Sequence, residues 1–218
     1  MEHVEVGSRL APGAAARSRV YQLLALGFSF PDQDLFDAIR DGVFADALDA
    51  AHGALPWASP ALAGSDLARP GDTYDGFEAE YIRLFDVGPG GAPCPLYGGV
   101  YVGDRMKVME EAIRFYDLFH LRLTPRLRDM PDHVATELEF LHYLTFREAE
   151  RRAAGDDPTP LLRAERDFLE RHLRRWLPVM QDRLRRQDTL PFFPALVGYA
   201  VGHVRADHGY LTAELHGG

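Results

Sequence analysis

The stretch that decides the fold runs from Phe77 to Leu144. It opens with FEAEYIRLFDVGPGGAPCPLYGGVY (77–101) and closes with MPDHVATELEFLHYL (130–144). Two helical patterns flank a loop rich in Gly and Pro, and the second helix opens on Pro131-Asp132-His133. Neither segment has the spacing of a catalytic nucleophile or a phosphate-binding loop. The combination suits an extended, partly apolar, positively charged ligand such as a peptide.

Apolar residues recur at helical spacing along most of the chain, which predicts an all-α fold. We expect a first helix from about Ala14 to Phe28, and a second that is capped by Asp32 or Asp34 and continues to Leu48. The remaining helices are expected over about 72–85, 104–119, 131–144, 159–186 (two helices, bent at Pro178) and 191–208. The buried face of the 104–119 helix is expected to consist of Met106, Met109, Ile113 and Tyr116, and that of the next helix of Val134, Leu138, Leu141 and Leu144.

The chain shows neither a convincing period-2 strand pattern nor an internal repeat. We therefore predict a single irregular helical domain of about eight helices over 14–218, after a disordered tail over 1–13. A Gly- and Pro-rich connection at about 52–71 interrupts it. Such a connection would permit helix exchange between two subunits, so a homodimer stays open.

The composition limits the class of protein. Hydrophobic residues make up 46% and charged residues 26% of the 218 residues, and the formal net charge of -9 disfavours nucleic acid as a partner. Cys94 is the only cysteine, which fits a reducing compartment. The N-terminus lacks the apolar run of a secretory signal, and no apolar run reaches the ~18 residues of a membrane span. We expect a cytoplasmic protein without stable membrane insertion.

One pattern also occurs in metal enzymes. Glu139 and His142 form an E-x-x-H pair of the kind used in di-iron carboxylate bundles, with His133 and Glu137 nearby. However, Glu139 lies about 200° around the helix from Glu137, which argues against a shared site. His133 and Glu137, four residues apart, do share a face, while helix capping would account for Asp132. A helical carboxylate/His metal-binding enzyme remains the alternative; no catalytic residue and no metal ligand is assigned.

The aromatic residues of the loop are the stronger signal. Tyr97 and Tyr101 follow Pro95 where Gly and Pro exclude an interior helix, and aromatic rings with a polar tip suit partly wet interfaces. Nearby acids, among them Glu80 and Asp86, could pair with arginines of a bound peptide. The competing interpretation is a helical scaffold in which these tyrosines only fill the core.

Several segments in order resemble the TorD/DmsD family of molybdoenzyme assembly chaperones. They are RSRVYQLLALGFSFP (17–31), the E-x-E-Y-x-x-L-F run ending at Phe85, PLYGGVY (95–101), PDHVATELEFL (131–141) and DFLERHLRRWLPVM (167–180). The resemblance covers most of the chain. The Cys-Pro-Leu-Tyr loop is most similar to the chaperones of the dimethylsulfide, ethylbenzene and selenate or chlorate enzymes.

The resemblance implies a chaperone rather than an enzyme, with no cofactor of its own. Such proteins bind the twin-arginine signal peptide of an apo molybdoenzyme catalytic subunit and hold that subunit for cofactor insertion before export. By motif match, the peptide site would include Tyr21, Tyr81, Leu84, Phe85, Tyr97, Tyr101, Pro131, Asp132 and His133. The chemistry of the loop and of the helix start adds Glu80, Pro95 and Glu137.

Overall fold

The computed structural model describes residues 10–57, 64–87, 90–123 and 130–217. Within these ranges the chain forms nine α-helices of at least eight residues, two of four residues and one π-helical turn, with no strand beyond an isolated bridge. The elements are α1 (Pro12–Phe28), α2 (Gln33–Arg40), α3 (Val43–Gly53), α4 (Gly64–Leu67), α5 (Tyr74–Tyr81), the π-helix η1 (Ile82–Asp86), α6 (Gly99–Val102), α7 (Arg105–Leu118), α8 (Val134–Ala154), α9 (Thr159–Arg171), α10 (Leu173–Leu184) and α11 (Phe192–Gly217). The all-α prediction is confirmed.

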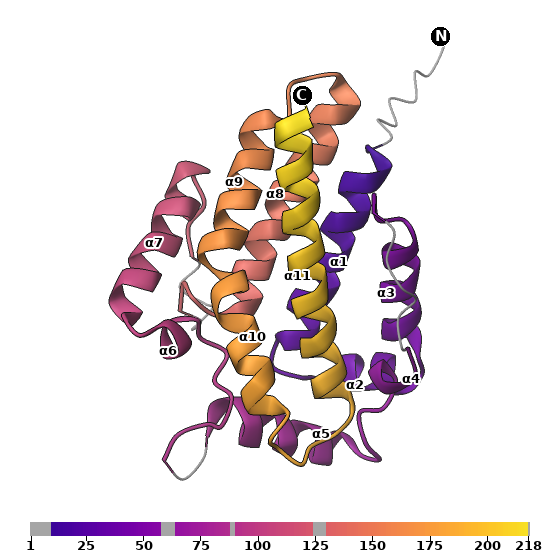
Figure 1. The fold of residues 1–218 in the computed structure, drawn as a ribbon. Helices are drawn as coiled ribbons and strands as arrows, with labels where there is room; N and C mark the ends of the chain where they lie inside the picture. Colours follow the sequence, from indigo (N-terminus) through magenta and orange to yellow (C-terminus); the bar gives the residue numbers. More distant parts are fainter. Residues whose placement is uncertain (1–9, 58–63, 88–89, 124–129, 218) are drawn as a thin grey trace.

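The helices α1, α8, α9, α10 and α11 form the central bundle (Figure 1). The expected stripe of α8 is confirmed, since Val134, Leu138, Leu141 and Leu144 are each 0% exposed. In Figure 1, α3 flanks the bundle beside α1, α7 lies on the opposite side, and α5 lies across one end. Among the described helices, none combines the length and the low charge that crossing a bilayer requires.

Two helices, not one, follow α1. Asp32 caps α2 as expected, because its side chain accepts from the backbone N–H of Leu35 at 2.8 Å. The single helix expected to continue to Leu48 is wrong. The chain turns at Gly42, whose φ of 81° is readily reached only by glycine, and α3 starts at the next residue.

The buried face expected for α7 is wrong at Met106 and Ile113, whereas Tyr116 is buried as expected and Met109 is half-buried. Met106 is 64% and Ile113 40% exposed, whereas Val108 and Ala112 are buried beside Tyr116. The Tyr116 ring packs edge-on against Phe140 of α8, with 4.9 Å between the ring centroids. Because α7 lies at the edge of the bundle, only a narrow stripe of it is covered, and its larger apolar residues stay outside.

Other boundaries differ from the expectations. The break between α9 and α10 falls at His172, which has φ -116° and ψ -100°, while Pro178 lies inside α10. The last helix extends nine residues past the expected end at 208, to Gly217. The expected connection at 52–71 contains α4, with 58–63 outside the described residues. Helix α1 starts at Pro12; residues 1–9 of the expected tail lie outside the described part, so the disorder stays a prediction.

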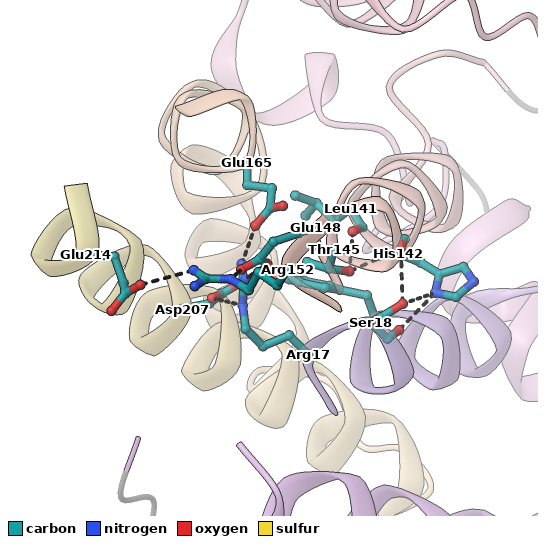
Figure 2. Close-up of polar contacts among 11 residues, drawn as sticks. Arg17, Ser18, Leu141, His142, Thr145, Glu148, Arg152, Glu165, Asp207 and Glu214 are labelled. Atoms are coloured by element: carbon teal, nitrogen blue, oxygen red, sulfur yellow. Dashed lines mark hydrogen bonds and ion pairs between the residues drawn. The ribbon is translucent and has the colours of Figure 1, made fainter. Parts of the chain in front are cut away.

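A buried cluster of charges joins four helices of the bundle (Figure 2). Arg17 of α1, 0% exposed, donates to Glu148 of α8 and Glu165 of α9 at 2.5 Å each, and to both carboxylate oxygens of Asp207 of α11 at 2.6 and 3.1 Å. Burial raises the pKa of Glu165 to about 8, against the opposing effect of Arg17. A protonated Glu165 leaves Arg17 and Arg152 to balance Glu148 and Asp207.

Candidate functional site

The segment before α6 is attached to the start of α8 by backbone hydrogen bonds. Val134 donates to the carbonyl of Leu96 at 2.8 Å, Gly98 donates to the carbonyl of Asp132 at 2.9 Å, and Tyr97 forms an isolated antiparallel bridge with His133. These bonds hold the Tyr97 and His133 rings together, with 5.1 Å between their centroids. The loop is therefore a fixed part of the site.

The start of α8 differs in detail from the expected cap. His133 is the N-cap, and its Nδ1 accepts from the backbone N–H of Ala135 at 3.2 Å, so Pro131 and Asp132 lie before the helix. Asp132 is 0% exposed, and its Oδ2 accepts from the backbone N–H of Gly99 at 2.9 Å. The interpretation of Asp132 as a capping residue is thus wrong: it positions the loop.

A cavity of about 620 Å³ opens between the end of α1, the α5–η1 segment, the loop and the first turns of α8. This volume lies in the range of roughly 300–1,000 Å³ that is usual for ligand sites. Its wall consists of Ser29, Phe30, Tyr81, Phe85, Asp86, Leu96, Tyr97, His133, Ala135, Thr136 and Glu139. The sequence-predicted residues Tyr81, Phe85, Tyr97 and His133 therefore meet in one place.

Aromatic rings form one side of this cavity. Tyr81 is fixed by a hydrogen bond from its hydroxyl to the carbonyl of Phe28 at 2.9 Å. Its ring packs edge-on against Phe85 at 5.1 Å and Phe30 at 5.5 Å between centroids. The π-helical turn η1 supplies Phe85 and then Asp86, and such turns are frequent at functional sites.

Carboxylates stand at the rim. Asp86 and Glu139 both line the cavity and are exposed, and they approach it from η1 and from α8 respectively. Acids beside aromatic faces suit an arginine, which pairs with carboxylates and stacks on rings. Asp86 was noted in the sequence only as nearby charge, and Glu139 only as a metal ligand of the alternative hypothesis.

Phe30 is the cavity residue that the sequence-based prediction missed most clearly. It is 56% exposed at the cavity, although it is a large apolar side chain. A signal was present, because Phe30 directly precedes the Pro31 that halts the first helix. A phenylalanine placed at a helix end, beyond the apolar stripe, is less constrained to face the core.

Three of the other expected site residues, Pro95, Tyr101 and Glu137, belong to a set of contacts around Trp176 instead. The Tyr101 ring stacks on Trp176 at 5.6 Å between centroids, and its hydroxyl donates to the carbonyl of Pro95 at 2.8 Å. Glu137 is 0% exposed and accepts from Trp176 Nε1 at 3.1 Å, with His172 Nδ1 at 3.0 Å from its other oxygen. Burial raises the pKa of Glu137, although these two partners oppose the shift.

The remaining expected residues lie elsewhere. Tyr21 is fully buried and donates to Asp207, and Leu84 is 0% exposed in the core. Glu80 accepts two hydrogen bonds from Arg83, at 2.6 and 2.7 Å. The carbonyl of Pro131 accepts from the Tyr116 hydroxyl at 2.7 Å. None of these residues, nor Pro95, Tyr101, Asp132 or Glu137, belongs to the described cavity wall.

The residues of the metal-enzyme alternative have separate surroundings. His133 caps α8, Glu137 contacts His172 and Trp176, and Glu139 stands at the cavity rim. His142 Nδ1 lies 2.8 Å from the Ser18 hydroxyl, as Figure 2 shows. In the part of the chain that the structure describes, no group of three or more His, Cys, Asp or Glu side chains could hold a metal ion.

Comparison with known proteins gives consistent matches. The family model described as nitrate reductase delta subunit matches residues 45–182. The chain is 34% identical to the perchlorate reductase assembly chaperone protein of Dechloromonas aromatica over 209 residues, covering 92% of each. It is 42% identical to the selenate reductase assembly chaperone protein of Thauera selenatis over 150 residues, 68% of this chain and 76% of that one.

The fold has a counterpart among solved structures. A protein from Archaeoglobus fulgidus, described as a redox enzyme maturation protein, superposes with a TM-score of 0.50 over 90% of this chain and 93% of that one, at 20% identity. At this identity the likeness concerns the fold alone, whereas the matches of sequence identify the family, as the motifs indicated. The chain belongs to the nitrate reductase delta subunit family, among the TorD-type assembly chaperones of molybdoenzymes.

Proposed function

We propose that this protein is a dedicated chaperone whose cavity binds the twin-arginine signal peptide of a molybdoenzyme catalytic subunit. Related proteins bear the names of assembly chaperones for perchlorate, selenate and chlorate reductases. By this proposal the chaperone holds the apo subunit in the cytoplasm until its cofactor is inserted. The protein acts by binding, and no catalytic residue is assigned to it.

One observation carries the proposal: exposed carboxylates and aromatic rings meet in a single cavity. Asp86 of η1 and Glu139 of α8 supply negative charge, and Phe30, Tyr81 and Tyr97 supply aromatic rings in the same cavity wall. An arginine side chain can satisfy both, by charge-assisted hydrogen bonds and by stacking of its guanidinium group. A few such desolvated contacts correspond to micromolar affinity, about -8 kcal/mol.

The test measures whether the cavity carboxylates recognise the two arginines of the peptide. Fluorescence anisotropy would follow binding of a labelled twin-arginine peptide and of the same peptide with both arginines replaced by glutamine. We expect the wild type to prefer the twin-arginine peptide by about tenfold or more. The double variant Asp86→Asn/Glu139→Gln should lose this preference, because it removes both rim charges.

A matched double variant controls for net charge. Asp182→Asn/Glu150→Gln also removes two acids, whose side chains are 63% and 40% exposed in surface ion pairs outside the cavity. It should keep the preference of the wild type. Equal binding of both peptides by the wild type, or an unchanged preference in Asp86→Asn/Glu139→Gln, would refute the proposed site.

A further inference from the structure

A second, smaller cavity of about 200 Å³ adjoins the first along α8. Leu121 and Leu123, which follow α7, form one side of it, and Phe140 and Tyr143 of α8 form the other. Thr136 and Glu139 line both cavities. The two cavities are therefore neighbours that share Thr136 and Glu139 in the N-terminal half of α8.

The distance along α8 from the first cavity to the second suits an extended peptide. Thr136, Phe140 and Tyr143 are spaced at i, i+4 and i+7, so they lie along one face of α8. From His133 to Tyr143 the helix rises by about 15 Å, which an extended chain covers in about five residues. A peptide whose arginines occupy the first cavity thus reaches the second within a few residues.

The two cavities differ in charge. Asp86 lines only the first cavity and Glu139 lines both, while Arg122 lines only the second and donates to Asp117 at 2.6 Å. Besides Arg122 and the shared wall, the second cavity presents aliphatic and aromatic side chains, and Leu123 is 39% exposed there. Because Asp86 does not line it and most of its lining is apolar, the second cavity favours an apolar side chain.

We infer that the second cavity binds the apolar segment that follows the arginines of the same signal peptide. Signal peptides place a continuous apolar run directly after their positively charged region. With the arginines at Asp86 and Glu139, that run extends along α8 toward Leu123 and Tyr143. This inference rests on the proposed function and adds the direction of the bound peptide and a second specificity element.

The experiment compares two twin-arginine peptides that differ only after the arginines. One carries a leucine-rich segment, and the other has serine in place of each leucine. We expect the wild type to bind the leucine peptide about tenfold more tightly. Leu123→Gln should weaken binding of the leucine peptide about threefold to tenfold and leave the serine peptide unchanged. Leu118→Gln is the matched control, since Leu118 is 68% exposed on α7 and lines neither cavity.

The outcomes separate this inference from the proposed function. Equal affinity of the wild type for both peptides, or equal weakening of both by Leu123→Gln, would overturn the second subsite and leave the arginine site standing. If the wild type binds neither peptide, the proposed function fails and the inference fails with it. If Leu118→Gln weakened binding of the leucine peptide as much as Leu123→Gln does, the inference would also be overturned, because the effect would then not be specific to the second cavity.

Discussion

Arg17 provides the sharpest test of what holds the bundle together. Its guanidinium group is 0% exposed and donates four hydrogen bonds to carboxylates on α8, α9 and α11. Replacing it in the variant Arg17→Met keeps a long apolar stem but removes the charge and all four hydrogen bonds. The carboxylates would then face one another in the core without the cation that links their helices.

The remaining partners set the size of the effect. Without Arg17, Glu148 still accepts from Arg152 at 2.6 Å. Glu165, whose pKa burial already raises to about 8, stays neutral because the opposing effect of Arg17 is gone. Among the hydrogen bonds of the described residues, Asp207 keeps the one from the hydroxyl of Tyr21. Leaving one charge of a buried ion pair without its partner lowers the free energy of unfolding by about 3–5 kcal/mol. This is a large share of the roughly 5–15 kcal/mol that stabilises a typical domain.

Urea denaturation followed by circular dichroism measures this cost at constant pH. Arg19→Met is the control, because Arg19 is exposed and donates to the exposed Gln22 on the surface of α1, and it should cost less than about 0.5 kcal/mol. Adding Asp207→Asn to Arg17→Met should recover part of the stability, since it removes the stranded charge. A loss below about 1 kcal/mol in Arg17→Met, or a further loss in the double variant, would refute this reasoning.

Three further predictions concern the cluster and the loop. Burial raises the pKa of Glu165 to about 8 from 4.5, so its stabilising contribution is complete below about pH 4.5 and is lost as the pH rises toward 8. The unfolding free energy of the wild type should therefore fall by about 2 kcal/mol between about pH 6 and 8, and Glu165→Gln should flatten this fall. An unchanged dependence of the unfolding free energy on pH, measured by urea titrations, would contradict this. Asp132→Ala removes the acceptor of the Gly99 N–H and should lower the unfolding free energy by about 1–3 kcal/mol, whereas Asp132→Asn keeps an acceptor and should lower it less. Equal decreases of the melting temperature in the two variants would count against the role of Asp132 in positioning the loop. Gly99→Ala would place its Cβ 2.7 Å from the backbone Cα of Arg105 and should destabilise the protein by about 1–3 kcal/mol. Gly53→Ala serves as the control, because its Cβ would meet no atom within 4 Å at the end of α3. Similar urea midpoints for the two variants would contradict the prediction, because the backbone would then accommodate the Cβ at Gly99 without loss of stability.

Local pattern predicted the fold class and the main helices because these depend on short-range periodicity. The stripe of α8 could be found since its period is intact over many turns. The break at Gly42 could not, because a single glycine inside a helical pattern does not reveal its φ. The face of α7 depends on which helices cover it, which is a long-range property that the spacing of Met106 and Ile113 does not contain.

The Arg17 cluster shows the same limit with polar residues. Its partners lie 131 to 190 residues away in the chain, so no local spacing links them. A signal did exist: Arg17 precedes Tyr21, Leu24 and Phe28 at i+4, i+7 and i+11, which places an arginine on the apolar face of α1. An arginine in that position requires buried carboxylates, although the sequence does not say which ones.

The candidate site was predictable in part. Tyr81, Phe85, Tyr97 and His133 were found because they flank the loop that the Gly/Pro pattern marks. Tyr101 was assigned to the same site because it lies four residues after Tyr97, but the turn into α6 directs its ring to Trp176. Burial of Glu137 and Asp132 could not be anticipated either, since both side chains are covered by segments distant in the sequence.

The central claim is that the signal peptide occupies the cavity beside the loop, and photocrosslinking tests it most directly. A twin-arginine peptide with a photoreactive residue next to the arginines would be irradiated with the full-length protein, and the products mapped by mass spectrometry. The account predicts crosslinks to the cavity wall, at Ser29–Phe30, Tyr81–Asp86, Leu96–Tyr97 and His133–Glu139. Crosslinks confined to other surfaces, such as the outer face of α7 around Met106 and Ile113, would contradict it.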